Sequence, residues 1–282
     1  MGDSFVDYNS IPIKSREEVA MLRLAGKISA KILEDLTPHV QPGVTKKELN
    51  DIAYNLIVNK YGAEVDREDL TGYDSSAYAC VSFSHNEIAF NGEATNIPLK
   101  KGDIFGVDVS LKKEGWCGDT SRQWIVGDDT SAQARLLVAV AYQAMCLGIK
   151  LVRPGAKLQD IAVTVQKYVE SFGFSMLRVG SATGHSIGRV HADGWHIPFY
   201  HDPRNEGRVL QEGMVITIEP FICAGKSEGI RVDNVTRSAV TTDNSLAAYW
   251  EHVVAITKDG CEVLDLREGE DVTFYGEVSK LV

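Results

Sequence analysis

The segment GVDVSLKKEGWCGDTSR, residues 106–122, places Asp108 and Asp119 in a stretch that otherwise has the composition of two strands joined by a turn. A two-residue turn at residues 113 and 114 would pair the two aspartates across a hairpin, with their Cβ atoms about 4.5–5.5 Å apart. If both were ionised, they would repel each other by roughly 3 kcal/mol at an effective dielectric constant of about 20. A shared proton or a bound cation would remove this repulsion. The alternative is that one aspartate is solvated or paired with a basic neighbour.

The acidic pattern recurs in the second half of the chain, because the sequence contains an internal repeat. Two pairs of segments resemble each other: residues 40–62 and 152–173, and residues 99–110 and 210–221. The first pair begins with a Pro-Gly turn followed by an amphipathic helix, and the second pair aligns Asp108 with Glu219. If the halves pack about a pseudo-twofold axis, Asp108 and Glu219 meet near that axis. We therefore expect a shared site between the halves.

Each half also begins with a further helical pattern. In the first half, Ser15 and Glu18 have the spacing of a capping box at the start of an amphipathic run, and residues 128–149 are the counterpart in the second half. Each half thus contains a helix, a Pro-Gly turn, a second helix and several strands. We predict an α+β fold in which two pseudo-twofold-related α/β halves surround a central antiparallel sheet.

The halves follow each other without a low-complexity or Ser/Gly-rich linker. We therefore expect one domain over residues 1–282, with the halves at roughly residues 15–125 and 130–265.

The composition is that of a soluble globular protein, with 44% hydrophobic and 24% charged residues. A net charge of −10 argues against nucleic acid as a partner, since phosphate binding requires clustered Lys and Arg. No apolar run has the length of a signal peptide or a membrane-spanning helix, so we expect no membrane partner. The five cysteines form no CxxC pair and suit reduced thiols. These features predict a cytoplasmic protein.

Histidines gather in the second half of the chain. The segment GHSIGRVHADGWHIPFYHD, residues 184–202, contains four of the seven histidines: His185, His191, His196 and His201. A lone histidine between glycines would more often be a loop residue than a metal ligand. Four histidines upstream of Glu219 favour a metal-binding or acid–base role for at least one of them.

Two glutamates also lie in apolar segments. Glu219 follows MVITI, and Glu251 stands between aromatic residues and a Val-rich strand in YWEHVVAIT. A glutamate in such a place is costly unless a cation pairs with it. Together with the two aspartates and a histidine, these glutamates form an oxygen-rich set that suits two divalent ions better than a single zinc. A pair of metal ions can activate water and polarise a carbonyl oxygen, so we expect amide hydrolysis.

These motifs occur in an order that resembles the methionine aminopeptidase family, in particular its short type I form. The resemblance covers nearly the whole chain, from SREEVAMLRLAGKIS through VQPGVT, GDIFGVDVS, GDTS, GHSIGR and GMVITIEPFICAG to YWEHVVAIT and GCEVL. It implies the pita-bread fold and two divalent metal ions: cobalt, manganese or iron, with zinc as the alternative. It also implies hydrolysis of the first peptide bond of a peptide or nascent protein, with methionine as the residue removed.

The resemblance further implies roles for individual residues. It makes five residues the metal ligands: Asp108, Asp119, His185, Glu219 and Glu251. Asp108 would bind one ion through both oxygens and His185 would bind the other, whereas Asp119 and Glu251 would bridge the pair. Glu219 would also act in catalysis by moving the proton of the attacking water.

The sequence departs from the family at the histidine that usually contacts the scissile amide nitrogen. Asn91, in HNEIAFNGEA, stands in its place as a catalytic and substrate-binding residue. An asparagine side chain donates a hydrogen bond but cannot ionise, so catalysis on an ordinary peptide should be weaker, or the leaving group should differ. His85, in an apparent insertion just upstream, either supplies the missing imidazole or is a solvated loop residue.

The expected substrate pocket contains further departures. We assign the second catalytic histidine, which also binds substrate, to His191 rather than His196, because His191 leaves the smaller length discrepancy. Tyr73 and Arg237 complete the substrate-binding set. Arg237 stands where the family often has tryptophan, and its cation would suit an acidic substrate unless the side chain is simply exposed. Cys117, where the family often has histidine, is either a packed thiol or a site of oxidation or soft-metal capture.

Two alternative functions remain open at this point. Asn91, Arg237 and the rearranged histidine loop favour a metal-dependent hydrolase of the same fold that is specialised for a non-methionyl peptide or a small amide metabolite. The other alternative is a non-catalytic binding protein on this fold, and the intact set of metal-binding side chains argues against it.

Overall fold

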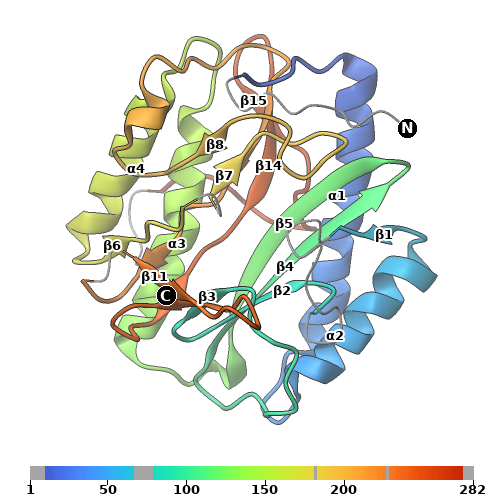
Figure 1. The fold of residues 1–282 in the computed structure, drawn as a ribbon, viewed down its shortest axis with the longest axis vertical. Helices are drawn as coiled ribbons and strands as arrows, with labels where there is room; N and C mark the ends of the chain where they lie inside the picture. Colours follow the sequence, from blue (N-terminus) through green and yellow to red (C-terminus); the bar gives the residue numbers. More distant parts are fainter. Residues whose placement is uncertain (1–9, 67–78, 181–182, 227–228, 276–282) are drawn as a thin grey trace.

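The computed structural model describes residues 10–66, 79–180, 183–226 and 229–275. Two pairs of helices lie at opposite sides of the molecule, with the strands between them (Figure 1). The first half of the chain contributes α1 (Arg16–Leu36) and α2 (Lys46–Tyr54), and the second half contributes α3 (Ala132–Leu151) and α4 (Leu158–Ser171). One helix pair per half agrees with the repeat in the sequence.

Local capping explains where the first helices begin. Ser15 Oγ accepts a hydrogen bond from the Glu18 backbone N–H at 3.2 Å, and the Glu18 carboxylate accepts one from the Ser15 N–H at 2.8 Å. This confirms the predicted capping box, and Thr45 and Glu48 form a second one at α2.

Helix α3 is buried between α4 and several strands. By length and composition it could cross a membrane, but 67% of its apolar window is buried inside the structure. Its hydropathy is therefore typical of a core helix.

The largest sheet contains seven strands and draws on both halves. Its order is β1-β4-β2-β3-β12-β11, and β5 also pairs with β4. The strands are β1 (Glu64–Val65), β2 (Ser82–His85), β3 (Ile88–Phe90), β4 (Ile104–Lys113), β5 (Trp116–Ile125), β11 (Ile230–Val232) and β12 (Ala239–Thr241). Because β11 and β12 come from the second half, this sheet joins the two halves.

Shorter strands of the second half form separate sheets in the described part of the chain. One contains β9 (Val215–Ile218), β14 (His252–Ile256) and β15 (Cys261–Val263); another contains β6 (Ser175–Met176), β10 (Ile222–Cys223) and β13 (Ala247–Ala248); the last contains β7 (Gly184–His185) and β8 (His196–Ile197). All pairs of these strands are antiparallel, as predicted. An isolated bridge between Ser121 and Glu251 links β5 to the start of β14.

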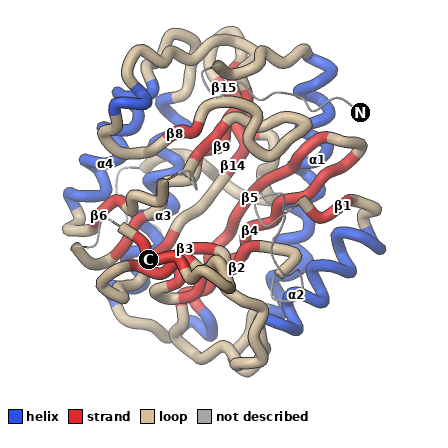
Figure 2. The backbone as a smooth tube through the Cα atoms, in the orientation of Figure 1, coloured by secondary structure: helices blue, strands red, loops and turns tan. Residues whose placement is uncertain are grey.

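Apolar packing follows the same division into halves, with helices outside and strands inside (Figure 2). In the first half, α1 packs across β4 and β5, and Phe83 stacks on Phe105 with ring centroids 5.6 Å apart. In the second half, α3 and α4 pack together and against strands such as β9 and β6. Polar residues placed between the two cores are therefore shielded from water on both sides.

The β4–β5 hairpin has a different register from the one predicted. Asp108 pairs with Ser121, and Asp119 pairs with Ser110, because the turn lies at Glu114 and Gly115 rather than one residue earlier. Both turn residues have positive φ, 53° and 74°, which a twist-matched two-residue hairpin requires and which glycine adopts without strain. The pairing shifts by two residues, so both aspartates remain on one face, diagonally related instead of directly opposite.

We expect Gly118→Ala to destabilise the fold by about 1–3 kcal/mol, through overpacking where α1 crosses β5. A Cβ at Gly118 would lie 2.5 Å from the Ala25 carbonyl, which belongs to the helix backbone and cannot move aside. Gly260→Ala is the matched control, because a Cβ there meets no described atom within 4 Å. Urea unfolding of both variants would measure the difference, and equal midpoints would contradict this account of the α1–β5 contact.

Candidate metal centre

The structure brings the five expected metal ligands together between the two halves. They come from different elements: Asp108 from β4, Asp119 from β5, His185 from β7, Glu219 directly after β9 and Glu251 directly before β14. All but Asp108 are buried. Three overlapping groups have ligand atoms within 4.8 Å of one another: Asp119, His185 and His191; His185, Glu219 and Glu251; Asp108, Asp119 and Glu251.

The backbone carbonyl of the next residue, Ser186, orients the His185 ring. Its Nδ1 lies 3.1 Å from the Ser186 carbonyl oxygen, which can only accept, so Nδ1 carries a proton. Its Nε2 then faces the carboxylates, 3.6 Å from Asp119 Oδ2 and 3.8 Å from Glu219 Oε1. A histidine fixed in this way can present Nε2 to a metal ion. In metal sites generally, hydrogen bonds from surrounding groups orient the histidine ligands in this manner.

Hydroxyl groups orient the carboxylates. Ser110 Oγ donates to Asp119 Oδ1 at 2.9 Å, and Tyr249 OH donates to Asp108 Oδ2 at 3.2 Å. Thr217 Oγ1 donates to Glu219 Oε1 at 2.8 Å and accepts from the His185 backbone N–H at 3.0 Å. These three hydroxyl residues were not identified from the sequence. Each lies two residues from one of the acidic candidates in the sequence, and that spacing was an available signal.

Crowding of the carboxylates shifts their protonation. Burial, followed by the charges of Asp119 and other carboxylates, raises the pKa of Glu251 well above its usual value. Burial also raises the pKa of Glu219 to about 7, although His185 opposes this. Glu251 Oε2 is buried and has no hydrogen-bond partner among the described residues. Clustered carboxylate oxygens that repel one another fit divalent cations.

His191 lies at the edge of the metal centre. Its Nδ1 is 3.5 Å from Asp119 Oδ2, and its ring centroid is 4.5 Å from that of His185. Its side chain is 32% exposed, whereas that of Asp119 is 2% exposed, so His191 faces the solvent side of the centre. His196 pairs with His185 across β7 and β8 but belongs to none of the three groups found in the described part of the chain.

The loop that carries His191 is held from two directions. Asp193 forms a largely buried ion pair with Lys14, which precedes α1. Arg189 lies over the Trp116 ring at 4.3 Å, and the Cys117 backbone N–H donates to the Gly188 carbonyl at 2.9 Å. The β4–β5 hairpin of the first half therefore supports the histidine loop of the second half.

Two residues of the expected substrate pocket lie next to each other. Asn91 follows β3, donates its backbone N–H to Ser82 Oγ at 3.0 Å and accepts from Ser238 Oγ at 2.9 Å. Ser82 pairs with Asp108 in the sheet, so Asn91 lies near the metal centre. Arg237 precedes Ser238, and both Asn91 and Arg237 have positive φ, 54° and 61°. Tyr73 lies outside the described residues.

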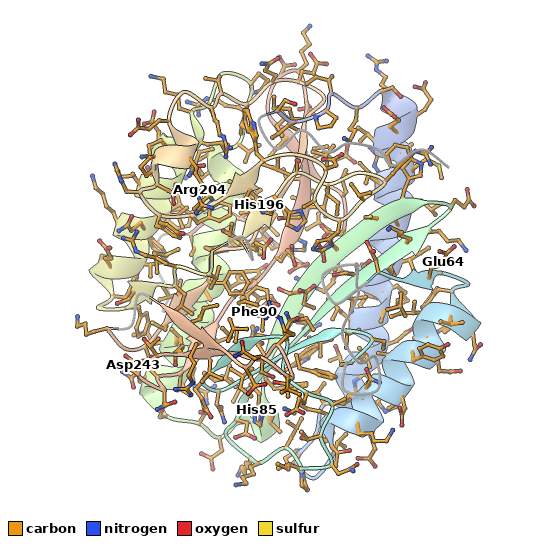
Figure 3. The ribbon with its side chains drawn as sticks, in the orientation of Figure 1. Glu64, His85, Phe90, His196, Arg204 and Asp243 are labelled. Atoms are coloured by element: carbon orange, nitrogen blue, oxygen red, sulfur yellow. The ribbon has the colours of Figure 1, made fainter. Side chains whose placement is uncertain are left out.

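The remaining candidates lie apart from this cluster. His85 is the last residue of β2 and pairs with Phe105 of β4. Its Nε2 is 2.9 Å from Asp103 Oδ2, and Figure 3 shows His85 far from His196. It does not supply the missing imidazole, because Asp103 holds it away from the centre. Cys117 is a packed thiol whose Sγ donates to the buried Asp66 carboxylate at 3.1 Å. Burial, with the charge of Asp66, raises the pKa of this thiol.

Comparison with known proteins identifies the chain's relatives. Metallopeptidase family M24 matches residues 20–258. The methionine aminopeptidase of Rickettsia prowazekii is 39% identical over 91% of this chain and 96% of its own length, and that of Escherichia coli K12 is 38% identical over 93% and 97%. The crystal structure of methionine aminopeptidase from Thermotoga maritima is 31% identical, covers 92% of this chain and 100% of its own, and has a TM-score of 0.83.

We expect the metal-free protein to lose stability as the pH rises from about 5 to about 9. The pKa of Glu219 rises from 4.5 to about 7 on folding; burial lowers that of His185, but Asp119 and Glu219 raise it overall from 6.5 to about 9. Both groups therefore bind more protons in the folded than in the unfolded state across this range, so raising the pH favours unfolding. The measurement is the thermal unfolding midpoint of chelator-treated protein at several pH values.

A divalent cation should remove most of this pH dependence, because it replaces the protons between the carboxylates. A midpoint of the metal-free protein that rises steadily over the same range would contradict the assignment.

Proposed function

The chain belongs to metallopeptidase family M24, and from this we infer that it is a metal-dependent aminopeptidase that removes an amino-terminal methionine. The observation that carries the inference is the convergence of four carboxylates and one imidazole at one buried point. Because the ligands come from both halves, we also infer that the chain works as a single catalytic domain.

We propose that two divalent ions occupy the centre, with cobalt, manganese or iron favoured over zinc by the oxygen-rich donors. Asp108 would bind one ion, and His185 and Glu219 the other. Asp119 and Glu251 each share one ligand group with Asp108 and another with His185, which supports a bridging role for both. When bound, the ions lower the pKa of water and polarise the scissile carbonyl group.

Glu219 is the proposed proton carrier of the reaction. Its carboxylate lies among the proposed ligands and, as a general base, can accept the proton of the attacking water and release it to the leaving amine. Thr217 Oγ1 donates a hydrogen bond to Glu219 Oε1. The other oxygen of Glu219 is therefore the one proposed to receive the proton of the attacking water and to pass it to the leaving amine. Exclusion of bulk water from this buried position keeps the transfer local.

His191 is the proposed second catalytic residue and substrate contact. Its position beside Asp119 and its partial exposure support a role at the boundary between the metal centre and the bound peptide. As an imidazole it can donate a hydrogen bond to the carbonyl oxygen on which negative charge develops.

The proposed partner is the free amino end of a peptide or nascent protein, and the proposed location is the cytoplasm, where such chains are made. None of the five cysteines forms a disulfide, which suits a reducing compartment. Asn91 and Arg237 support a second candidate, a preference for a small amide or a carboxylated substrate, because the Asn91 carbonyl oxygen accepts a hydrogen bond from Ser238, the residue that follows Arg237.

The metal-loaded protein should release methionine from Met-Ala-Ser. Asp108→Ala should reduce kcat/KM by more than about 100-fold, because loss of even an outer-layer partner of a metal ligand lowers metal affinity or activity by about 10–100-fold. Circular dichroism of the variant would show that its fold is intact. The function is wrong if the metal-loaded parent is inert on a panel of methionyl peptides, and cleavage of only acidic or small-amide substrates would favour the second candidate.

Asn91→His should raise kcat on Met-Ala-Ser by at least about 10-fold, because a positioned acid–base group contributes 10²–10⁴-fold. Histidine is among the residues that tolerate a positive φ, so the backbone at position 91 can accept it. Asn91→Asp is the matched control: it keeps the size but replaces the amide donor with an acceptor, and should give no gain. Unchanged kcat in Asn91→His would show that Asn91 does not limit catalysis.

A further inference from the structure

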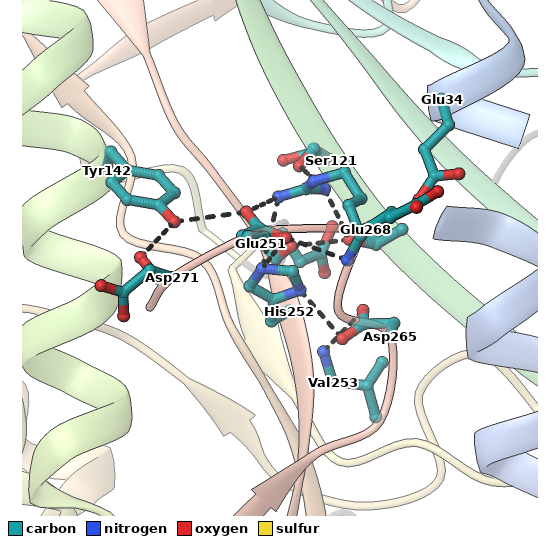
Figure 4. A network of polar contacts seen from close by, with 12 residues as sticks. Glu34, Ser121, Tyr142, Glu251, His252, Val253, Asp265, Glu268 and Asp271 are labelled. Carbon is teal, nitrogen blue, oxygen red and sulfur yellow. Dashed lines mark hydrogen bonds and ion pairs between the residues drawn. The ribbon is translucent and has the colours of Figure 1, made fainter. Parts of the chain in front are cut away.

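A second cluster of buried polar side chains lies beside Glu251 (Figure 4). It is formed by residues 265–271, which we call the C-terminal strap, and by the first residues of β14. One oxygen of the Asp265 carboxylate lies 2.9 Å from His252 Nδ1. The other oxygen accepts a hydrogen bond from the Val253 backbone N–H at 3.0 Å. Because these two residues follow Glu251 directly, the strap fixes the start of β14.

Arg267 extends the strap to β5. Its Nη1 donates to the Ser121 carbonyl oxygen at 3.1 Å, and its Nη2 lies 3.3 Å from His252 Nε2. Its guanidinium also pairs with Glu270, whose Oε2 is 3.3 Å from the same His252 nitrogen. One planar cation therefore contacts β5 and β14 at once, which a lysine ammonium cannot reproduce.

Three of the proposed ligands lie on or beside the strands that Arg267 joins: Asp119 on β5, Asp108 on the paired strand β4, and Glu251 directly before β14. The Glu251 carbonyl oxygen accepts from Thr120 Oγ1 at 2.8 Å and from the Ser121 N–H at 3.4 Å. Ser121 is also opposite Asp108 in the hairpin and two residues from Asp119. The backbones of these ligands thus meet at Ser121, whose carbonyl oxygen binds Arg267.

Both helical layers anchor the strap. The Glu268 backbone N–H donates to Glu34 Oε1 of α1 at 2.7 Å, and Tyr142 OH of α3 donates to the Asp271 carbonyl at 2.9 Å. The strap therefore connects the first half to the second at the level of the metal centre.

The charges of the cluster are buried but paired. His252 and Asp265 are fully buried, and Arg267 is 6% exposed. Burial alone would raise the pKa of Glu270, but His252 and Arg267 lower it to about 2, so Glu270 is ionised. A buried ionic network of this kind adds little stability compared with apolar packing of the same shape. Its directional contacts do, however, restrict where the joined strands can lie.

We propose that Arg267 and Asp265 are positioning residues of the metal centre, which hold Glu251 and the adjoining part of β5 in the geometry that binds the ions. Arg267 acts through Ser121 and His252 rather than through a ligand carboxylate. The proposal rests on the metal-dependent function given above, and extends it to a segment that supplies no ligand.

Arg267→Lys tests the proposal, with Arg23→Lys as the matched control. The Arg23 guanidinium also donates through two of its nitrogens, to the two carboxylate oxygens of Glu262 at 2.6 and 2.8 Å. Glu262 is on β15 and is not one of the proposed ligands. Both variants keep the positive charge but replace the planar guanidinium with a compact ammonium group. The readout is the affinity of chelator-treated protein for Mn²⁺ by titration calorimetry, with no peptide present, together with the thermal unfolding midpoint.

Arg267→Lys should bind Mn²⁺ about 10–100-fold more weakly than the parent, as expected for an outer-layer partner, and Arg23→Lys should bind it with unchanged affinity. If Arg267→Lys lowers the unfolding midpoint but binds Mn²⁺ as the parent does, the strap is only structural and the proposal is wrong. Should Arg267→Lys fail to fold, Asp265→Asn gives the same test, because it removes the charge that faces His252.

Failure of the proposed function would look different from failure of this inference. A parent protein that binds no Mn²⁺ would remove the metal-dependent function itself, and the role of the strap with it. A parent that binds Mn²⁺ but cleaves no methionyl peptide would remove only the substrate assignment, and the comparison of affinities would still decide the role of Arg267.

Discussion

The mutual repulsion of four clustered carboxylates, three of them buried, is the constraint on which the rest of this structure depends. Their ligand oxygens approach one another within a few ångströms, and burial raises the pKa of Glu251 far above its usual value. Left alone, such a cluster takes up protons or opens. Divalent cations, which membership of a metallopeptidase family implies, would compensate for this repulsion, and hydroxyl groups at Ser110, Thr217 and Tyr249 fix the orientation of three of the carboxylates.

A site of this kind requires stiff support, because repelling ligands move apart wherever the backbone allows it. In this fold, β5 of the first half meets the start of β14 of the second half at the bridge between Ser121 and Glu251. Helix α1 covers β4 and β5 on one side, while α3 covers β9 on the other. The ion pair between Lys14 and Asp193 and the C-terminal strap then tie the loop of His191 and the start of β14 to the same frame.

Much of this arrangement could be predicted from the sequence. The repeat indicated two equivalent halves, the capping box located the start of α1, and alternation along two strands put Asp108 and Asp119 on one face. The hairpin register was wrong, because the turn type depends on φ at Glu114 and Gly115, and the apolar pattern is compatible with both turn positions. The oxygen atoms that orient the ligands were missed, since serine and threonine in a strand are common without such a role.

The sequence by itself determined which side chains can bind metal and on which faces of their elements they lie, because those properties depend on residue type and local periodicity. Only the tertiary structure decided that His191 lies beside Asp119, that His85 turns to Asp103, and that Arg267 joins β5 to β14. These contacts depend on how loops and strands distant in the sequence pack together. Such packing is set by the whole core, and no local pattern of residues encodes it.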